Sequence, residues 1–315
     1  MKFLVTGFGG FVGERLCADL LGQSNCVRVA GRVAPMPMQG VDGVGVGDLS
    51  GGTDWTQAVG GIDAIIHLAA RVHVMDDKSA DPLAEFRKVN VDGTLNLARQ
   101  AAAAGVRRFV FMSSVKVNGE STQIGHPFTE ADAPSPQDAY GVSKYEAEQG
   151  LREIALKTGM EVVIIRPPLV YGPGVRANFA ALMRAVQKGV PLPLGAVYNQ
   201  RSLVSLDNLV DFVMTCATHP QAANQTFLVS DGHDLSTTEL VCGLADALNV
   251  PQRFLPVPVF LLKAGAAILG KRASVERLCG NLQVDTAKAR QLLGWVPPIM
   301  VDEGLRRAVA GMVKP

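Results

Sequence analysis

The sequence has almost no excess of charge of either sign. Lys and Arg number 30 and Asp and Glu number 29, so the formal net charge of the 315-residue chain is +1. A nucleic-acid-binding protein usually shows a basic excess or a basic stripe, and we therefore expect no nucleic-acid partner. Charged residues make up only 19% of the chain and hydrophobic residues 48%, a composition that excludes a disordered protein.

Long hydrophobic runs are also missing. The longest, at residues 257–270, has 14 residues and contains Lys263, whereas a membrane-spanning helix needs about 20. We interpret this run as a buried or interfacial helix and expect no membrane partner. The N-terminus lacks the features of a signal peptide, and the five cysteines include no Cys-x-x-Cys pair. The sequence thus predicts free thiols and a cytoplasmic location.

No strong metal-binding pattern is present either. His73, Asp76 and Asp77 lie close together, but their spacing matches no established ligand motif. His67 stands inside an apolar run, where a histidine is more often a hydrogen-bonded core residue than a catalytic one. We therefore expect no metal site.

Strand and helix patterns alternate through the first half of the chain. Apolar runs typical of buried parallel strands occur at residues 2–6, 26–30, 64–68, 108–112 and 161–166, and helical spacing occurs at 13–21, 81–104 and 139–157. This alternation predicts an α/β fold with a doubly wound parallel sheet of the Rossmann type. In such a sheet, ligands bind at the edge formed by the carboxyl ends of the strands.

The pattern changes after residue 170. Prolines become frequent, and short helices at 178–188, 207–218 and 237–248 alternate with short strands at 202–205 and 225–230. We predict a dinucleotide-binding domain over residues 1–170 and a smaller, mixed substrate-binding lobe over residues 171–315. Later strands of this lobe could return to the main sheet.

A glycine-rich loop follows the first predicted strand. Gly7, Gly10 and Gly13 have the spacing Gly-x-x-Gly-x-x-Gly and lead into the first predicted helix. Glycines in this context allow a tight turn, close approach of a pyrophosphate and close packing of helix on sheet. The helix N-terminus supplies free N–H groups for the anion. We predict that this loop, together with Phe11 and Val12, binds a dinucleotide cofactor.

The end of the second predicted strand bears on which cofactor is bound. A dinucleotide site usually has an acidic residue here to bind the ribose hydroxyls, but this chain has Gly31 followed by Arg32. A guanidinium suits a 2′-phosphate, and Arg15 could assist. The sequence therefore favours NADP(H), with NAD(H) as the alternative if Arg32 stacks on adenine or faces solvent.

A candidate acid–base group lies in the predicted helix at 139–157. Tyr140 and Lys144 are four residues apart, so they share one helix face. A nearby ammonium favours a phenolate, which predicts a lowered pKa for Tyr140 and a role in proton transfer. Such a pair often occurs by chance on surface helices. Ser113 and Ser114, however, follow the strand at 108–112 directly, where a hydroxyl could share a substrate oxygen with Tyr140.

Together, these segments resemble a known family. The stretches TGFGGFVG, HLAA, VNVDGTLNL, MSSVKVNG, YGVSK and RPPLVYGPG occur in this order between residues 6 and 174. They resemble the extended short-chain dehydrogenase/reductases, and look most like the nucleotide-sugar epimerases, dehydratases and ketoreductases. The resemblance covers nearly the whole chain.

The resemblance implies roles for residues at matching positions. Ser114, Tyr140 and Lys144 would be catalytic, and Lys144 would also bind the nicotinamide ribose. The cofactor would further contact Asp48, Leu49, Leu68, Ala69, Ala70, Asn90 and Pro167. In the second lobe, Asn178 would contact the nucleotide-sugar, and Arg201 and Arg277 would bind its diphosphate. Arg201 could instead form an ion pair with Asp207.

Three positions depart from the family pattern: Leu169 replaces a frequent asparagine, Gly31 replaces the acid typical of NAD binding, and Asn118 replaces a frequent tyrosine. The resemblance also implies a homodimer, in which the helices at 81–104 and 139–157 would pack against their copies. The alternative is that these helices present an exposed amphipathic face.

The function expected first is an NADPH-dependent reductase of a nucleotide-sugar ketone. Its substrate would be C4 of a UDP-4-keto-6-deoxy (N-acetyl)hexose in surface-polysaccharide precursor synthesis. The alternative is a UDP-glucose or UDP-N-acetylhexosamine 4-epimerase with bound NAD. A dehydratase is disfavoured because Val115 and Lys116 replace the acidic pair that usually follows the catalytic hydroxyl. A non-catalytic NADP-binding protein is a further alternative.

Overall fold

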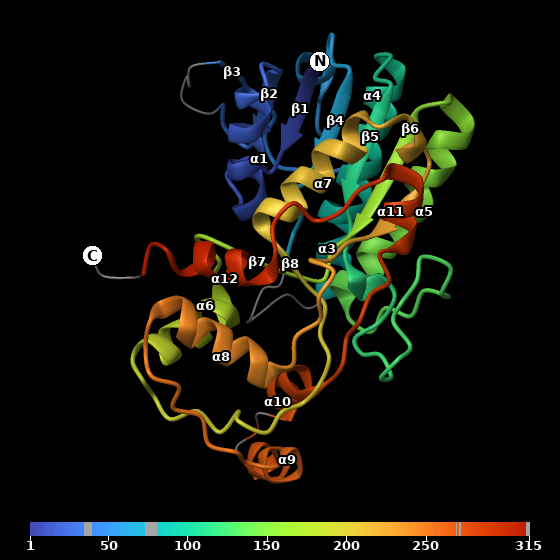
Figure 1. Ribbon diagram of the computed structural model, residues 1–315. Helices are drawn as coiled ribbons and strands as arrows, with labels where there is room; N and C mark the ends of the chain where they lie inside the picture. Colours follow the sequence, from blue (N-terminus) through green and yellow to red (C-terminus); the bar gives the residue numbers. More distant parts are fainter. Residues whose placement is uncertain (35–39, 73–80, 269, 271, 313–315) are drawn as a thin grey trace.

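A seven-stranded parallel sheet forms the centre of the molecule (Figure 1). The computed structural model describes residues 1–34, 40–72, 81–268, 270 and 272–312. The strands are β1 (Lys2–Thr6), β2 (Cys26–Gly31), β3 (Val41–Gly45), β4 (Ala64–His67), β5 (Arg108–Met112), β6 (Glu161–Arg166) and β9 (Thr226–Leu228). Their order is β3-β2-β1-β4-β5-β6-β9. The predicted Rossmann-type sheet is confirmed, and its order reverses between β1 and β4, where ligands bind in such sheets.

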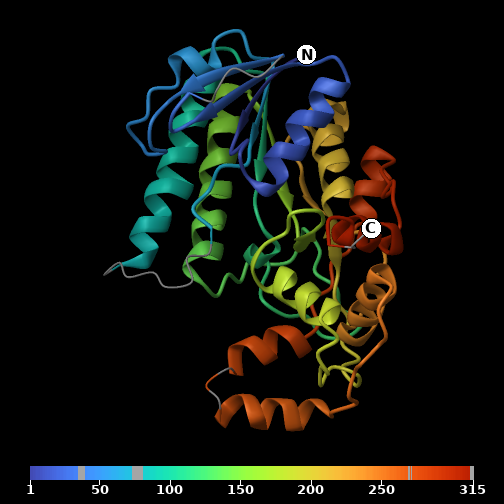
Figure 2. The same ribbon diagram turned by 90° about the vertical axis from the view of Figure 1, so that its left-hand side faces the viewer.

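Helices cover both faces of this sheet (Figure 2). One face carries α1 (Phe11–Gly22), α7 (Leu206–Thr218) and α11 (Ala287–Leu293). The other carries α2 (Thr56–Val59), α4 (Thr94–Ala103) and α5 (Ala139–Thr158). Because both faces are buried, the strands are mostly apolar, which explains why their sequence patterns were recognisable. The exception is β3, which was not predicted: its sequence VDGVG has no continuous apolar run, and three of its five residues are exposed at the sheet edge.

The helix predicted over residues 81–104 consists of three joined segments. These are α3 (Pro82–Arg87), the π-helical segment η1 (Lys88–Gly93) and α4. Asp81 caps the N-terminus of α3 by accepting a hydrogen bond from the N–H of Ala84 at 3.0 Å. A π-helical segment often marks a functional site, and this one carries Asn90.

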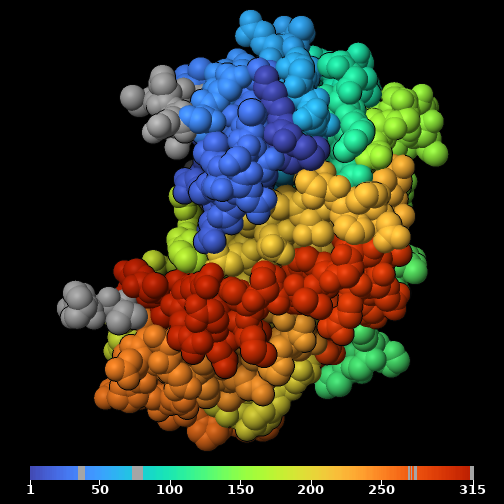
Figure 3. Space-filling model, turned by 45° about the horizontal axis from the view of Figure 1, so that its top comes forward, coloured from blue at the N-terminus to red at the C-terminus, as the bar shows by residue number. Residues whose placement is uncertain are grey.

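The second lobe has a separate hydrophobic cluster. It contains α6 (Ala177–Gln187), α8 (Thr237–Leu248), α9 (Val259–Ile268), α10 (Arg272–Cys279) and α12 (Val301–Val309), and the two-stranded sheet of β7 (Leu169–Tyr171) and β8 (Leu203–Ser205) lies above it. Short helices η2 (Val115–Val117) and η3 (Pro220–Ala222) complete the described elements. After residue 171 the chain returns to the main sheet at α7, β9 and α11, and so it passes repeatedly between the two cores. On the face shown in Figure 3, yellow residues of the second half of the chain lie directly against blue residues of the first. A domain boundary at residue 170 stays a prediction.

The apolar run at 257–270 contains α9, which has 10 residues. Across the residues that the structure describes, no helix combines the length and apolar character needed to cross a membrane. The five cysteines are free thiols.

Candidate active site

The glycine-rich loop forms a tight turn between β1 and α1. Gly7 has a φ of +73° and its carbonyl accepts a hydrogen bond from the N–H of Gly10 at 3.0 Å. A Cβ on Gly7 would lie 2.7 Å from the backbone nitrogen of Ala69, and a Cβ on Gly13 would lie 2.3 Å from the carbonyl oxygen of Gly7. Larger residues would therefore push apart the strand ends and the helix.

The helix N-terminus at this loop fits a dinucleotide pyrophosphate. Gly10 is the N-cap of α1 and provides no side-chain cap. The first-turn N–H groups, including those of Phe11, Val12 and Gly13, have no acceptor within the helix. A pyrophosphate would satisfy them and lie in the favourable field of the helix dipole.

At the end of β2, Gly31 and Arg32 lie where the sequence analysis expected them. A Cβ on Gly31 would come within 3.0 Å of the Phe8 ring, so this position is kept small. Arg32 is exposed, and its side chain forms no ion pair with the described residues. The expected assistance from Arg15 is wrong, because Arg15 forms ion pairs with Asp19 at 2.9 Å and Asp207 at 2.5 Å.

The loop after β3 approaches the start of α4. Asp48 is exposed in this loop, and its carbonyl accepts a hydrogen bond from the hydroxyl of Thr53 at 2.6 Å. Leu49 lies against Gly93, where an added Cβ would be 2.7 Å from the leucine Cγ. The close contact fixes this loop against the start of α4. The cofactor contacts of Asp48 and Leu49 stay a prediction.

Asn90 joins the loop after β4 to helix α5. Its side chain accepts a hydrogen bond from the N–H of Arg71 at 2.8 Å and donates one to the Arg71 carbonyl at 3.0 Å. It also donates to the hydroxyl of Ser143 at 3.0 Å. Leu68, Ala69 and Ala70, all half-buried, therefore belong to a loop that is fixed at both ends.

His67 is a core residue, as the sequence predicted. Its ring lies within hydrogen-bonding distance of the hydroxyls of Thr6, at 2.7 Å, and Thr94, at 2.9 Å. Burial, with a smaller effect of Lys144, lowers the pKa of His67 to about 3. The imidazole is therefore neutral at physiological pH.

The three candidate catalytic residues gather where β5 meets α5. Ser114 follows β5 and caps η2, accepting a hydrogen bond from the N–H of Lys116 at 3.3 Å. Tyr140 lies in the first turn of α5, which begins at Ala139 and has Asp138 as its N-cap. Lys144 donates a hydrogen bond to the carbonyl of Met112 at 2.8 Å. This bond draws α5 onto the strand end that carries Ser114.

The electrostatics of this group differ from the sequence-based expectation. Burial lowers the pKa of Lys144 to about 7, and the charge of Glu148 partly offsets that effect. Burial and then the charge of Asp138 raise the pKa of Tyr140 above its ordinary value, so the predicted lowering is wrong for this arrangement. The Lys144 ammonium does not offset this effect, because it lies 5.9 Å from the centre of the tyrosine ring and donates its hydrogen bond to the Met112 carbonyl.

A buried ion pair lies beneath the site. Arg166 binds both carboxylate oxygens of Glu148, at 2.9 and 2.6 Å, and neither side chain is more than 2% exposed. Ser113 donates a hydrogen bond to the same carboxylate at 2.6 Å. Glu148 was not predicted from the sequence. The available signal was its spacing: Tyr140, Lys144 and Glu148 follow one another at intervals of four residues, so they share one face of α5.

The ion pair also gives a structural role to Asn118, which departs from the family pattern. Its amide oxygen accepts a hydrogen bond from Arg166 at 2.9 Å, and its NH₂ group donates to the carbonyl of Thr129 at 2.9 Å. Asn118 thus ties the loop between η2 and α5 to the buried pair.

The proposed substrate residues lie in the second lobe. Asn178 is exposed in the first turn of α6. Arg201 donates hydrogen bonds to the carbonyls of Arg277 at 2.7 Å and Gly280 at 3.0 Å, so the structure brings the two arginines together. The alternative ion pair between Arg201 and Asp207 is not formed, because Asp207 binds Arg15 and Arg307.

Pro167 and Leu169, which the sequence analysis singled out, lie near the end of β6. Pro167 is buried, and its carbonyl accepts a hydrogen bond from the N–H of Val115 at 3.0 Å, which places it beside Ser114. Leu169 begins β7 and is 47% exposed.

No cluster of His, Cys, Asp and Glu in the described ranges could hold a metal, and His73, Asp76 and Asp77 lie outside those ranges.

The fold and the site define a dinucleotide-dependent enzyme of the short-chain dehydrogenase/reductase type. Residues 3–230 match the NAD dependent epimerase/dehydratase family, and the chain belongs to this family. It is therefore an NAD(P)-dependent epimerase or oxidoreductase.

Several proteins of known name are similar to this chain over nearly its whole length. The chain is 50% identical to a UDP-glucose 4-epimerase of Vibrio cholerae, over 99% of this chain and 96% of the relative. It is 27% identical to a GDP-6-deoxy-D-mannose reductase of Pseudomonas aeruginosa, over 97% and 95% of the two chains. Among solved structures, MoeE5 in complex with UDP-glucose and NAD superposes with a TM-score of 0.79 at 25% identity, covering 99% of this chain and 98% of MoeE5.

We predict that replacing Lys144 with Met changes the pH dependence of stability. The pKa of this ammonium falls from 10.5 to about 7 on folding, so between these pH values the unfolded chain binds the additional proton. The wild type should therefore gain stability relative to Lys144→Met as pH rises through this window, by up to about 1.4 kcal/mol per pH unit. Urea unfolding at a series of pH values measures the difference.

The matched control is Lys157→Met, on the same helix, where the lysine side chain is 75% exposed. It should show no such trend. Parallel stability curves for the wild type and Lys144→Met would contradict the assignment of a buried, easily deprotonated Lys144.

Proposed function

We propose that this protein is a UDP-sugar 4-epimerase that uses bound NAD. The observation that carries the proposal is 50% identity to a UDP-glucose 4-epimerase over 99% of the chain, combined with Ser114, Tyr140 and Lys144 at one edge of the sheet. This is the function that the sequence analysis placed second. The reductase that it placed first is supported only by more distant relatives.

The residues at the sheet edge would move the proton of the sugar C4 hydroxyl. Tyr140 takes this proton as the C4–H bond breaks and returns it when the bond re-forms on the opposite face, so no net redox change occurs. Ser114 donates a hydrogen bond to the same oxygen and stabilises its charge. Bound NAD would supply a reversible hydride acceptor beside this carbon.

Lys144 would orient the site rather than react. Its bond to the Met112 carbonyl fixes α5 on β5, and its partly deprotonated state places little positive charge beside Tyr140. Burial raises the pKa of Tyr140, which suits the half-reaction in which the phenol returns its proton. The first half-reaction needs the phenolate, which positive charge on a bound oxidised nicotinamide would favour.

The cofactor would lie along the edge formed by the strand ends. Its pyrophosphate would bind at Gly7, Gly10, Phe11, Val12 and Gly13. Its adenosine would contact Arg32, Asp48 and Leu49, and its nicotinamide end would contact Leu68, Ala69, Ala70, Asn90, Tyr140, Lys144 and Pro167. The tight turn and uncapped helix N-terminus support this placement.

The UDP group of the substrate would bind in the second lobe. Asn178, Arg201 and Arg277 are the proposed contacts. The support is the contact between Arg201 and the Arg277 backbone, which holds both residues at one end of α10. Arg201 uses one guanidinium nitrogen for its two carbonyl bonds, so the rest of its donor fork is left for phosphate oxygens.

A second candidate is the NADPH-dependent reduction of a UDP-4-keto-6-deoxy (N-acetyl)hexose at C4. The specific observation in its favour is the end of β2, where small Gly31 and exposed Arg32 suit a 2′-phosphate. Tyr140 would then protonate the alkoxide at C4, with Ser114 as hydrogen-bond donor. In this reaction NADPH would be consumed.

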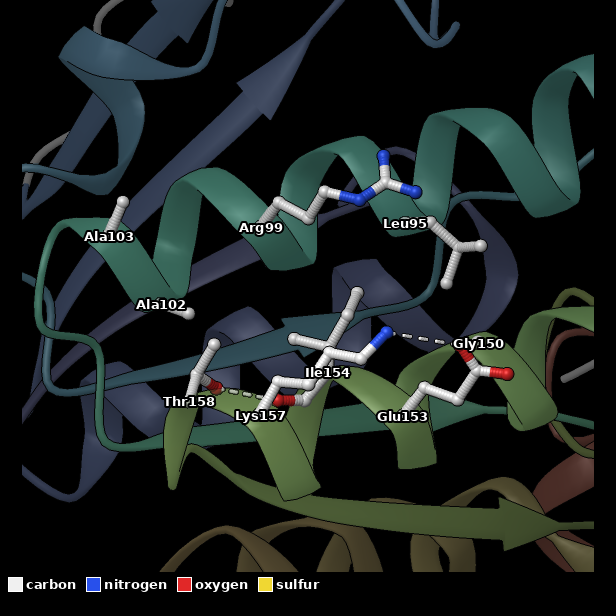
Figure 4. A pocket seen from close by; sticks show the side chains of 9 residues that line it. All are labelled: Leu95, Arg99, Ala102, Ala103, Gly150, Glu153, Ile154, Lys157 and Thr158. Atoms are coloured by element: carbon white, nitrogen blue, oxygen red, sulfur yellow. Dashed lines mark hydrogen bonds and ion pairs between the residues drawn. The ribbon is translucent and has the colours of Figure 1, made fainter.

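We also propose that the protein is a homodimer formed by α4 and α5. A groove of about 350 Å³ runs between these helices, lined by Leu95 and Arg99 on one side and Glu153 and Ile154 on the other (Figure 4). Leu156, on α5, is 88% exposed. At about 100° per residue, Leu156 lies about 60° around α5 from Glu153, outside the groove lining. An exposed apolar side chain next to a groove with opposite charges suits pairing with a second copy across a two-fold axis.

Tyr140→Phe should abolish epimerisation, with a loss of at least about 100-fold in kcat, because the phenol can no longer exchange a proton. Conversion of UDP-glucose to UDP-galactose, and of their N-acetyl forms, is followed by chromatography. Tyr145→Phe, one turn along α5, is the control and should retain activity. Turnover that survives Tyr140→Phe would exclude the acid–base role.

The cofactor and the reaction type can be tested together. If Arg32 binds a 2′-phosphate, Arg32→Ala should weaken NADPH binding about 10-fold or more and leave NADH binding unchanged. Net loss of reduced-nicotinamide absorbance with a UDP-4-keto sugar would support the reductase. Interconversion of UDP-sugars without net loss, together with equal NADPH binding by the wild type and Arg32→Ala, would support the epimerase.

Leu156→Lys should dissociate the dimer, because it would bury charge in the apolar part of the interface. Sedimentation equilibrium at micromolar concentration measures the mass of each form. Ile124→Lys, which changes a 67% exposed loop residue, is the control and should leave the dimer intact. A wild-type monomer at this concentration would refute the interface.

A further inference from the structure

Helix α9 has two apolar faces, and the protein covers only one of them. Val259 and Leu262 pack against the hydrophobic cluster of the second lobe, and Ala266 is buried. This covered face holds the helix in place beside α10. The other face makes no comparable contact.

The uncovered face is continuous and apolar. Phe260, Leu261 and Ile268 are 69%, 51% and 87% exposed, and Ala264 and Ala267 are exposed as well. At about 100° per residue, these five positions fall within about 120° of the helix circumference. They therefore form one stripe, which we call the α9 stripe. Isolated surface hydrophobic residues are ordinary, but a stripe of this kind marks an interaction surface.

Positive charge borders the α9 stripe. Lys263 is exposed at its edge, and residues 246–277 contain five basic residues and two acidic ones. Arg253 is also exposed, and Arg272 is exposed and forms an ion pair with Glu276 at 2.8 Å. In a chain whose net charge is only +1, this segment is a local concentration of cationic and apolar residues.

The helix is also well placed to meet a flat surface. Figures 1 and 2 show α9 at the end of the second lobe farthest from the parallel sheet, on the outer side of α10. It is 10 residues long, too short to cross a bilayer. A short helix with an apolar face and flanking basic residues suits the interfacial region of an anionic membrane.

We propose that α9 docks the protein on an anionic lipid surface, with the α9 stripe inserted among the acyl chains and Lys263 near the headgroups. The surface would then lie near the end of α10, where Arg201 contacts Arg277. This inference does not depend on which reaction the protein catalyses. It runs against our expectation of no membrane partner, which concerned a spanning helix.

Flotation of the full-length protein with vesicles tests the proposal. Wild type should float with vesicles of phosphatidylglycerol and phosphatidylethanolamine, and at least 10-fold less with phosphatidylcholine alone. The double variant Phe260→Ser/Ile268→Ser should lose at least 10-fold in binding. The double variant Ile124→Ser/Met300→Ser removes two exposed apolar residues elsewhere, 67% and 81% exposed, and should bind as wild type does.

Tryptophan fluorescence gives a second test of membrane binding that does not depend on flotation. Trp55 and Trp295 are only 2% and 7% exposed, so a Leu261→Trp variant adds the one indole at the proposed surface. Its emission should shift to shorter wavelength with anionic vesicles. Failure of the wild type to bind anionic vesicles, or equal binding by Phe260→Ser/Ile268→Ser, would overturn the proposal. A change in oligomeric mass of that variant without vesicles would instead assign the stripe to a contact between copies.

Discussion

The buried ion pair between Glu148 and Arg166 is the interaction on which the active-site geometry depends. It joins α5 to the end of β6, and through Ser113 it also holds the end of β5. Two opposite charges away from water are stable only when each is paired and hydrogen-bonded, and removing one partner leaves a costly buried charge. Because the pair is bidentate and shared with Ser113, it constrains orientation as well as distance.

The positions of the candidate catalytic residues follow from this constraint. Ser114 comes directly after Ser113, and Lys144 lies one turn before Glu148 on α5. The bond from Lys144 to the Met112 carbonyl adds a second attachment between the same helix and strand. Asn118 extends the network to the loop that leads to Tyr140, so strand, helix and loop are fixed by one set of polar contacts.

The loop between β1 and α1, where we propose that the cofactor pyrophosphate binds, depends on a different constraint: two of its glycines have no room for a side chain. At Gly7 and Gly13 an added Cβ would enter the space of backbone atoms. The loop can therefore bring α1 close to the strand ends, with its N–H groups directed at a bound anion. Few charges are needed for such binding, which is consistent with a net charge of +1. The basic residues around α9 are the exception, and they lie in the other lobe.

The sequence by itself determined the elements whose patterns are local. Buried strands such as 108–112 and 161–166 were predicted correctly because both sheet faces are covered, and the Gly7 loop and the Tyr140–Lys144 pair were visible from spacing alone. Strand β3 was missed because its sequence VDGVG has no continuous apolar run and lies at an exposed edge of the sheet. Only the tertiary structure decided the long-range partners. Arg15 binds Asp207 rather than assisting Arg32, and Arg201 binds the end of α10 rather than Asp207. The direction of the Tyr140 pKa likewise depends on burial and on where the Lys144 ammonium points. These outcomes are set by distances between residues far apart in the chain, which spacing along the sequence does not encode.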